Sequence, residues 1–269
     1  MLGLSLIGTA WTPNWLAVGV IACGLCTGLM MPALTAAMQV LFRRSLQGRV
    51  SSIMNAGTSV GIILAVPTVL LLTDAWRITY LGFAILAVLG AVASWFLLPS
   101  VSRIVPATLV DPAPLPELPW SRLIRLVLFC FTTGFISSAY WIFAPDLVIT
   151  LGSYPTQASA LLWLAVGLAG LGGAIVADLA DRSNPPITQA LMIMVLAAST
   201  AILAASPNQI ALTSFSTVMF GLSYVSLTGS HLMTGISLLP GRLAAGPVVQ
   251  FMAIALGQAV CSPFRGLCT

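Results

Sequence analysis

The chain has very few charged residues and no lysine. Ten arginines and six acidic residues make up 6% of its 269 positions, whereas a soluble domain carries about 25% charged residues. They lie in short clusters between seven stretches without Asp, Glu, Lys or Arg: 1–42, 50–73, 78–102, 126–145, 147–177, 183–241 and 243–264. About 20 apolar residues cross the hydrocarbon core of a bilayer as a helix. The scarcity of charge therefore excludes a water-soluble domain and predicts repeated membrane crossings.

The apolar stretches also indicate which kind of structure crosses the membrane. In lipid every backbone N–H and C=O needs an internal partner, so only helices and closed barrels span the bilayer. Barrel strands alternate apolar and polar residues over about ten positions, whereas these stretches are continuously apolar. We therefore expect an all-α, polytopic membrane protein. The net charge of +4 is an excess of arginine, whose placement indicates topology and not a nucleic-acid partner.

Residues that carry catalytic or metal chemistry are scarce as well. The chain has one His and five Cys. Cys23 and Cys26 form a C-x-x-C pair, but inside an apolar segment without a nearby His, so we expect small-residue helix packing and not a zinc or redox site. A membrane enzyme needs clustered His, Asp, Glu or Cys at a bilayer surface. We expect neither enzymatic activity nor a cofactor.

Turn residues and charges divide the chain into about nine helices, the first of them partial. The expected spans are 1–11, 15–42, 48–72, 78–98, 121–149, 155–181, 187–205, 208–238 and 242–262. Residues 99–120 are rich in proline, which predicts a semi-rigid linker instead of a helix. The predicted organisation is an N-terminal half-bundle over 1–98, a cytoplasmic linker over 99–120 and a C-terminal half-bundle over 121–269. Two such halves are typical of transporters.

The arginines fall mainly on one side of this predicted topology. When the spans alternate, Arg77 and Arg265 lie on one side, and the other side carries Arg43, Arg44, Arg49, Arg103, Arg122, Arg125, Arg182 and Arg242. Arginine accumulates in the cytoplasmic loops of membrane proteins. The larger group is therefore predicted to face the cytoplasm, and we expect a multi-pass protein of a bacterial inner (plasma) membrane.

Two motifs resemble those of the major facilitator superfamily. Asp74-Ala-Trp76-Arg77, leading into Tyr80-Leu-Gly-Phe83, looks like the turn that opens the sixth helix of that family. Ala177-Asp178-Leu179-Ala180-Asp181-Arg182 is similar to the family's cytoplasmic loop motif, Gly-x-Leu-Ala-Asp-Arg-x-Gly-Arg-Arg, in its second copy. Ala177 replaces the first Gly of this motif, Asn184 replaces the second, and the trailing basic pair is absent.

The resemblance implies a fold of two six-helix halves, of which this chain would cover part of the third helix to the eleventh. On this interpretation the chain is truncated at both ends. The resemblance also implies a cytoplasmic gate at Asp178, Asp181 and Arg182, because a carboxylate and an arginine at a helix end can latch neighbouring helix termini together. The alternative is that these residues are only a generic charged stop signal.

The resemblance further implies that the fourth, seventh and tenth helices of the family, which are 15–42, 121–149 and 208–238 in this sequence, line a central cavity. On the tenth, Thr217, Gly221, Tyr224, Thr228, His231 and Gly235 form one polar stripe, which should face a cavity or a neighbouring helix. The substrate-cavity candidates are Thr35, Gln39, Asn55, Tyr140, Trp141, Tyr224, Thr228 and His231. The aromatic residues on the seventh helix, Tyr140, Trp141 and Phe143, either shape a pocket or form an interfacial belt. His231 is either a proton carrier or a hydrogen-bonded packing residue.

These features predict a secondary active transporter, an efflux or uptake permease, that moves a small solute across the lipid bilayer by alternating access. The solute should be apolar or weakly polar, because the predicted spans place no arginine at mid-membrane. Proton coupling would depend on His231 or on a group outside the visible spans, and passive transport is the remaining option. Two alternatives stay open: a truncated, non-transporting fragment of such a carrier, and a ten-helix carrier of the drug/metabolite type.

Overall fold

A computed structural model describes residues 1–97, 117–182, 184–240, 242 and 244–261, without the side chains of residues 69, 73, 156 and 180–182. Helices form all the regular secondary structure of these residues. The first part of the chain comprises α1 (Leu2–Gly8), α2 (Pro13–Leu41), α3 (Arg44–Leu71), the 3-10 turn η1 (Thr73–Ala75) and α4 (Trp76–Leu97). The second part comprises α6 (Trp120–Asp146), the π-helical turn η3 (Leu147–Leu151), α7 (Thr156–Arg182), α8 (Pro185–Ala205), α9 (Ile210–Leu238) and α10 (Ala245–Cys261).

The predicted all-α, polytopic fold is confirmed, with small shifts at helix ends. Within the described ranges, seven helices are long and apolar enough to cross a membrane, and α10 is a shorter apolar helix. The main difference is at α3, which begins at Arg44 and not at Gly48. Helix α2 begins where Thr12 caps it: the Thr12 side chain accepts a hydrogen bond from the Trp15 N–H, and Pro13 occupies the first turn, where a missing N–H costs nothing.

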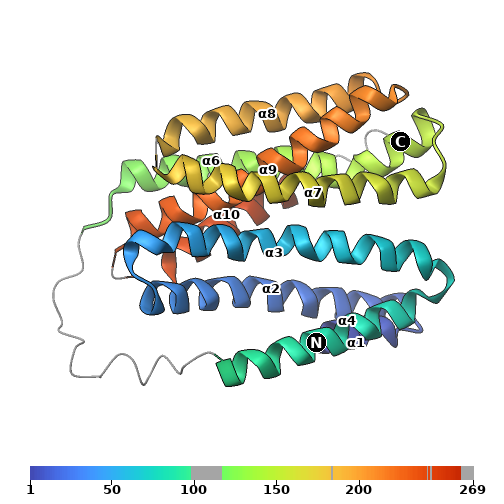
Figure 1. The fold of residues 1–269 in the computed structure, drawn as a ribbon, viewed down its shortest axis with the longest axis horizontal. Helices are drawn as coiled ribbons and strands as arrows, with labels where there is room; N and C mark the ends of the chain where they lie inside the picture. The colour runs from blue at the N-terminus through green and yellow to red at the C-terminus, as the bar shows by residue number, and fades with distance from the viewer. Residues whose placement is uncertain (98–116, 183, 241, 243, 262–269) are drawn as a thin grey trace.

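Successive helices run in opposite directions, as the predicted topology requires (Figure 1). The connections α2–α3, α7–α8 and α9–α10 lie at the left end of the view, together with the start of α6. The connections α3–α4, η3–α7 and α8–α9 lie at the right end. By their positions at helix ends, Arg43, Arg44, Arg122 and Arg242 belong to the left end. Arg103 and Arg265 fall outside the described residues.

Arg77, at the opposite end, has a structural role. It lies at the start of α4, and its Nη2 donates a hydrogen bond to the Ala10 carbonyl oxygen at 2.9 Å, just beyond the end of α1. Its guanidinium carbon lies 4.8 Å from the Trp11 ring centroid and 4.4 Å from that of Trp76. Cations over aromatic faces are stabilised by the ring quadrupole. Arg77 therefore joins the end of α1 to α4.

Helix α9 lies at the centre of the second part of the chain, where it packs against α6, α7, α8 and α10 and also against α3. Two groups of buried apolar residues surround it. The larger one includes Tyr140 on α6, Val166 on α7, Leu196 on α8 and Phe220 on α9. The smaller one joins α6 to α10. The C-x-x-C pair is divided: Cys23 packs against Gly3 of α1, whereas Cys26 is exposed.

Helices α6 and α10 approach each other closely at two glycines. A Cβ added at Gly134 would fall on the Ile254 backbone carbonyl, and one added at Gly257 would fall on the Phe131 carbonyl. Helix association in lipid depends on such close backbone packing, because lipid is as apolar as the side chains it replaces. The Gly134 and Gly257 contacts therefore set the distance between α6 and α10.

We expect Gly134→Ala to destabilise the fold by about 1–3 kcal/mol, because the added methyl group can be accommodated only if the α10 backbone moves. The matched control is Gly57→Ala on α3, where an added Cβ would meet nothing within 4 Å. Thermal unfolding in detergent checks both variants. Equal melting temperatures for Gly134→Ala and Gly57→Ala would show that this close approach does not determine stability.

Candidate functional site

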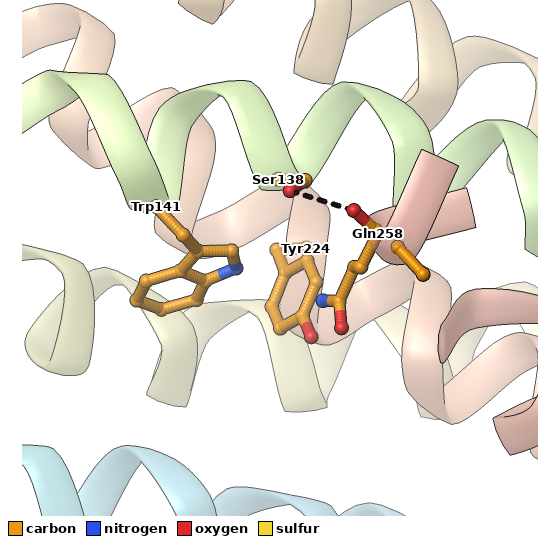
Figure 2. A pocket seen from close by; sticks show the side chains of 5 residues that line it. Ser138, Trp141, Tyr224 and Gln258 are labelled. Atoms are coloured by element: carbon orange, nitrogen blue, oxygen red, sulfur yellow. Dashed lines mark hydrogen bonds between the residues drawn. The ribbon is translucent and has the colours of Figure 1, made fainter. Parts of the chain in front are cut away.

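A cavity of about 490 Å³ opens among α6, α9 and α10. It is lined by Ser138 and Trp141 of α6, Tyr224 of α9, and Gln258 and Ala259 of α10. Figure 2 shows the Trp141 and Tyr224 rings side by side, with the Gln258 side chain next to Tyr224. The Ser138 hydroxyl donates a hydrogen bond to the Gln258 backbone carbonyl at 3.3 Å, which fixes α10 against α6. The lining thus combines two aromatic rings with hydroxyl and amide groups.

Stacked aromatic rings hold the Trp141 wall of this cavity in place. The Trp141 ring stacks on Trp163 of α7, with 4.9 Å between centroids. It also meets Phe220 and Tyr224 edge-on at 5.2 and 5.5 Å. Such pairs contribute about 0.5–1.5 kcal/mol each beyond simple burial. The indole is therefore supported from both α7 and α9.

Tyr140, the neighbour of Trp141 in sequence, is buried in the protein core. Its ring stacks on Phe220 at 3.8 Å, and its hydroxyl donates to Thr217 Oγ1 at 2.9 Å. The sequence left open whether Tyr140, Trp141 and Phe143 shape a pocket or form an interfacial belt. The structure places Trp141 at the cavity and Tyr140 in the packing behind it.

Asn55 and Thr228 meet across the contact between α3 and α9. Asn55 Nδ2 donates to the Val225 carbonyl oxygen at 2.7 Å and to Thr228 Oγ1 at 3.0 Å. Gly229 permits this approach, because a Cβ there would lie 3.3 Å from Asn55 Nδ2. Both candidates therefore engage each other, and their polar groups join residues 1–98 to residues 121–269.

His231 is fully buried between α9 and α6. Its Nε2 lies 3.1 Å from Thr133 Oγ1, and the Thr133 hydroxyl also lies 2.9 Å from the Phe129 carbonyl oxygen. A hydroxyl has one proton, and the carbonyl can only accept, so Thr133 donates to Phe129 and accepts from His231 Nε2–H. This assignment leaves Nδ1 as an acceptor, and it has no partner among the described residues.

The two candidates on α2 are not among the described residues that line the cavity. Thr35 is buried, and its hydroxyl donates to the Met31 carbonyl oxygen at 2.8 Å. The Gln39 side chain donates to the Thr35 carbonyl oxygen, and the Gln39 carbonyl oxygen accepts from Gln47 Nε2 at 3.2 Å. The structure therefore does not bring these residues together with Trp141 and Tyr224.

Of the three gate candidates, the structure describes the side chain of Asp178 only. Asp178 lines a groove of about 330 Å³ between α3 and α7, together with Arg49 of α3. This groove lies toward the arginine-rich end of the bundle, where α3 begins and α7 ends. The side chains of Asp181 and Arg182 are outside the described part of the chain.

Sequence reasoning missed Ser138 and Gln258 as cavity residues. A usable signal existed for Gln258, because Gln250 and Gln258 are eight residues apart and therefore lie on one face of a helix. Polar residues in an apolar span face a cavity or a neighbouring helix. Gln250 is fully buried and donates to the Thr228 carbonyl oxygen at 2.8 Å, and Gln258 reaches the cavity.

Removal of the Asn55 amide should weaken the contact between α3 and α9. We expect Asn55→Leu to lower stability by about 1 kcal/mol, the usual contribution of a hydrogen bond between membrane helices. The control is Thr68→Val, since the Thr68 hydroxyl donates to the Ala65 carbonyl oxygen of its own helix α3. Melting temperatures in detergent compare the two. A larger loss in Thr68→Val than in Asn55→Leu would contradict the assigned role of Asn55.

Comparison with known proteins supplies the family. The family model described as Major Facilitator Superfamily matches residues 1–262. A comparison with curated proteins found no match. The apolar helices and this match together make the chain a multi-pass integral membrane protein, of a family of small-solute transporters and not of enzymes. The match favours this carrier type over the ten-helix drug/metabolite type. The chain belongs to the Major Facilitator Superfamily.

Proposed function

We propose that this chain is a secondary active carrier that moves a small, uncharged solute by alternating access, and that the solute binds in the cavity among α6, α9 and α10. The observation that carries the proposal is the lining of this cavity, which presents two aromatic rings beside a hydroxyl and an amide. Ligand sites typically combine mostly apolar walls with a few polar groups that orient the ligand.

The chemistry of the lining selects against charged solutes. None of its five described residues carries a charge. A charged solute in the membrane interior would lack a counter-ion there, which is costly. The faces of Trp141 and Tyr224 suit an apolar or aromatic group. Ser138 and Gln258 supply hydrogen-bonding atoms, which suits a weakly polar solute.

The proposed motion separates residues 1–98 from residues 121–269, with residues 99–120 as the connecting linker. The contact of α3 with α7 supports it: Ser59 is buried, and a Cβ at Gly170 would fall on its hydroxyl. Small residues let helices slide or rock against each other. Asn55 is the amide that bridges the same boundary to α9.

The arginine-rich end is proposed to face the cytoplasm of a bacterial inner membrane, by the positive-inside rule. Asp178 and Arg49 line one groove at that end, across the boundary between α3 and α7. Their opposite charges suit a latch that holds the cytoplasmic side closed, with Asp181 and Arg182 as further members implied by the loop motif. The direction of transport, efflux or uptake, does not follow from this arrangement.

Transport by the 269-residue chain in proteoliposomes tests the proposal, with a panel of neutral solutes at the external face. We expect Trp141→Ala to lower the uptake of any transported solute about tenfold, because the solute loses an aromatic wall. The control is Trp95→Ala on α4, where the ring is 82% exposed. Equal uptake by both variants would remove the cavity from the mechanism. Solute binding without transport would support the non-transporting alternative.

His231 is the proposed site of proton coupling, since it is the only His and its Nδ1 is an acceptor without a described partner. Imidazole is the side chain that exchanges protons near neutral pH. We expect His231→Gln, which keeps an N–H donor for Thr133, to flatten the dependence of transport on pH. Thr133→Val is the control and should retain the dependence. An unchanged pH profile in His231→Gln would exclude His231 from coupling.

A further inference from the structure

A second cavity shares the Trp141 side chain with the first. It has a volume of about 270 Å³ and is lined by Ile62, Ala65 and Val66 of α3, by Trp141 of α6, and by Ala160 and Trp163 of α7. Its described lining is aliphatic and aromatic throughout. A hydrogen-bonding ligand group would be left without a partner there, which is costly. The second cavity therefore suits a purely apolar group.

The two cavities share one side chain, because Trp141 lines both. Within the second cavity its ring stacks on Trp163, and toward the first it meets Tyr224 edge-on. The indole is thus a common wall with polar groups on one side and apolar groups on the other. A single ligand that passes this indole can place chemically different ends in the two spaces.

We propose that the solute is a neutral amphiphile that occupies both cavities at once. Its hydrogen-bonding head lies with Ser138, Tyr224 and Gln258, and its apolar tail lies between α3 and α7. This inference rests on the proposed function in taking the first cavity as the solute site. No described residue that lines either space carries a charge, so the head is taken as uncharged.

The second cavity, called the tail cavity because it would hold the apolar tail, lies between the two proposed halves. Its lining comes from α3 on one side and from α6 and α7 on the other, so it straddles the boundary between residues 1–98 and 121–269. The described lining of the first cavity, called the head cavity because it would hold the polar head, comes from α6, α9 and α10. A tail therefore contacts both proposed halves, whereas a head alone contacts one. Tail length should accordingly control how strongly the solute stabilises the state in which α3 and α7 are close.

Binding of a series of linear primary amides, from propanamide to nonanamide, tests the two-part site. The chain is held in lipid nanodiscs, and free ligand is measured by equilibrium dialysis against empty nanodiscs. We expect the association constant to rise about fourfold for each methylene until the tail cavity is full, as burial of a CH₂ group predicts. Terminally brominated amides should also quench tryptophan fluorescence, and Trp163→Phe should reduce that quenching.

Variants separate the two parts of the site. Ala160→Phe fills the tail cavity and should abolish the gain with tail length while the shortest amides keep their affinity. Ala65→Leu fills it from the α3 side and should act in the same direction, which guards against a folding defect in one variant. The control is Leu161→Phe, next in sequence on α7 but 56% exposed. Gln258→Leu should weaken every amide about tenfold and leave the gain per methylene intact.

Three results would overturn the inference: no binding of any amide, affinity that does not depend on tail length, or an undiminished gain with tail length in both cavity-filling variants. These outcomes are distinguishable from failure of the proposed function, because binding is measured without transport. If transport of another neutral solute depends on Trp141 while the amide series fails, the carrier proposal stands and the amphiphile proposal falls. If the amides bind as expected and none is transported, the two-part site stands without the carrier.

Discussion

The arrangement of this bundle depends on one constraint: the polar groups of α9 lie in a medium without water and need hydrogen-bond partners, several of which lie on other helices. Those partners come from every helix around it. On α6, Tyr140 bonds Thr217 and Thr133 bonds His231. The Gly173 carbonyl of α7 bonds Ser226, and on α8 the Ser199 carbonyl bonds Ser216 and Gln189 bonds Ser230. Gln250 of α10 and Asn55 of α3 donate to the backbone carbonyl oxygens of Thr228 and Val225. Each bond fixes the rotation and height of one neighbour relative to α9.

The candidate site is formed by side chains of α9 and its neighbours that these bonds do not engage. Along the polar stripe of α9, Thr217, Thr228 and His231 are engaged by neighbouring helices, and Gly221 and Gly235 are in close contact with Val166 and Gly246. Tyr224 is the member of the stripe that lines the described cavity. The same rings that pack α6 and α7 against α9 then form the cavity wall, so packing and ligand binding use the same residues.

Much of the fold could be predicted because the composition of each segment determines which structure it forms in lipid. Continuous apolar runs require helices in lipid, and the arginines at their ends indicate the sidedness of each connection. Part of the site could be predicted too, since Trp141 and Tyr224 are polar-edged aromatic residues inside apolar spans. Ser138, Gln258 and Trp163 were missed for a definite reason. Whether a side chain on a nearly all-apolar helix faces a cavity depends on the rotation of that helix, and neighbouring helices set this rotation.

Composition and the placement of charges are therefore enough to predict the class of protein, the number and direction of its described helices, and the residue types available to a binding site. They are enough because the cost of burying charges and unpaired backbone groups in lipid acts on each segment separately. Helix packing was needed to establish that Asn55 bonds α9, that His231 is enclosed beside Thr133, and that Trp141 lines both a polar and an apolar cavity. The two hydrogen-bonded pairs join residues 170 and 98 positions apart, and they form only when the helices have packed.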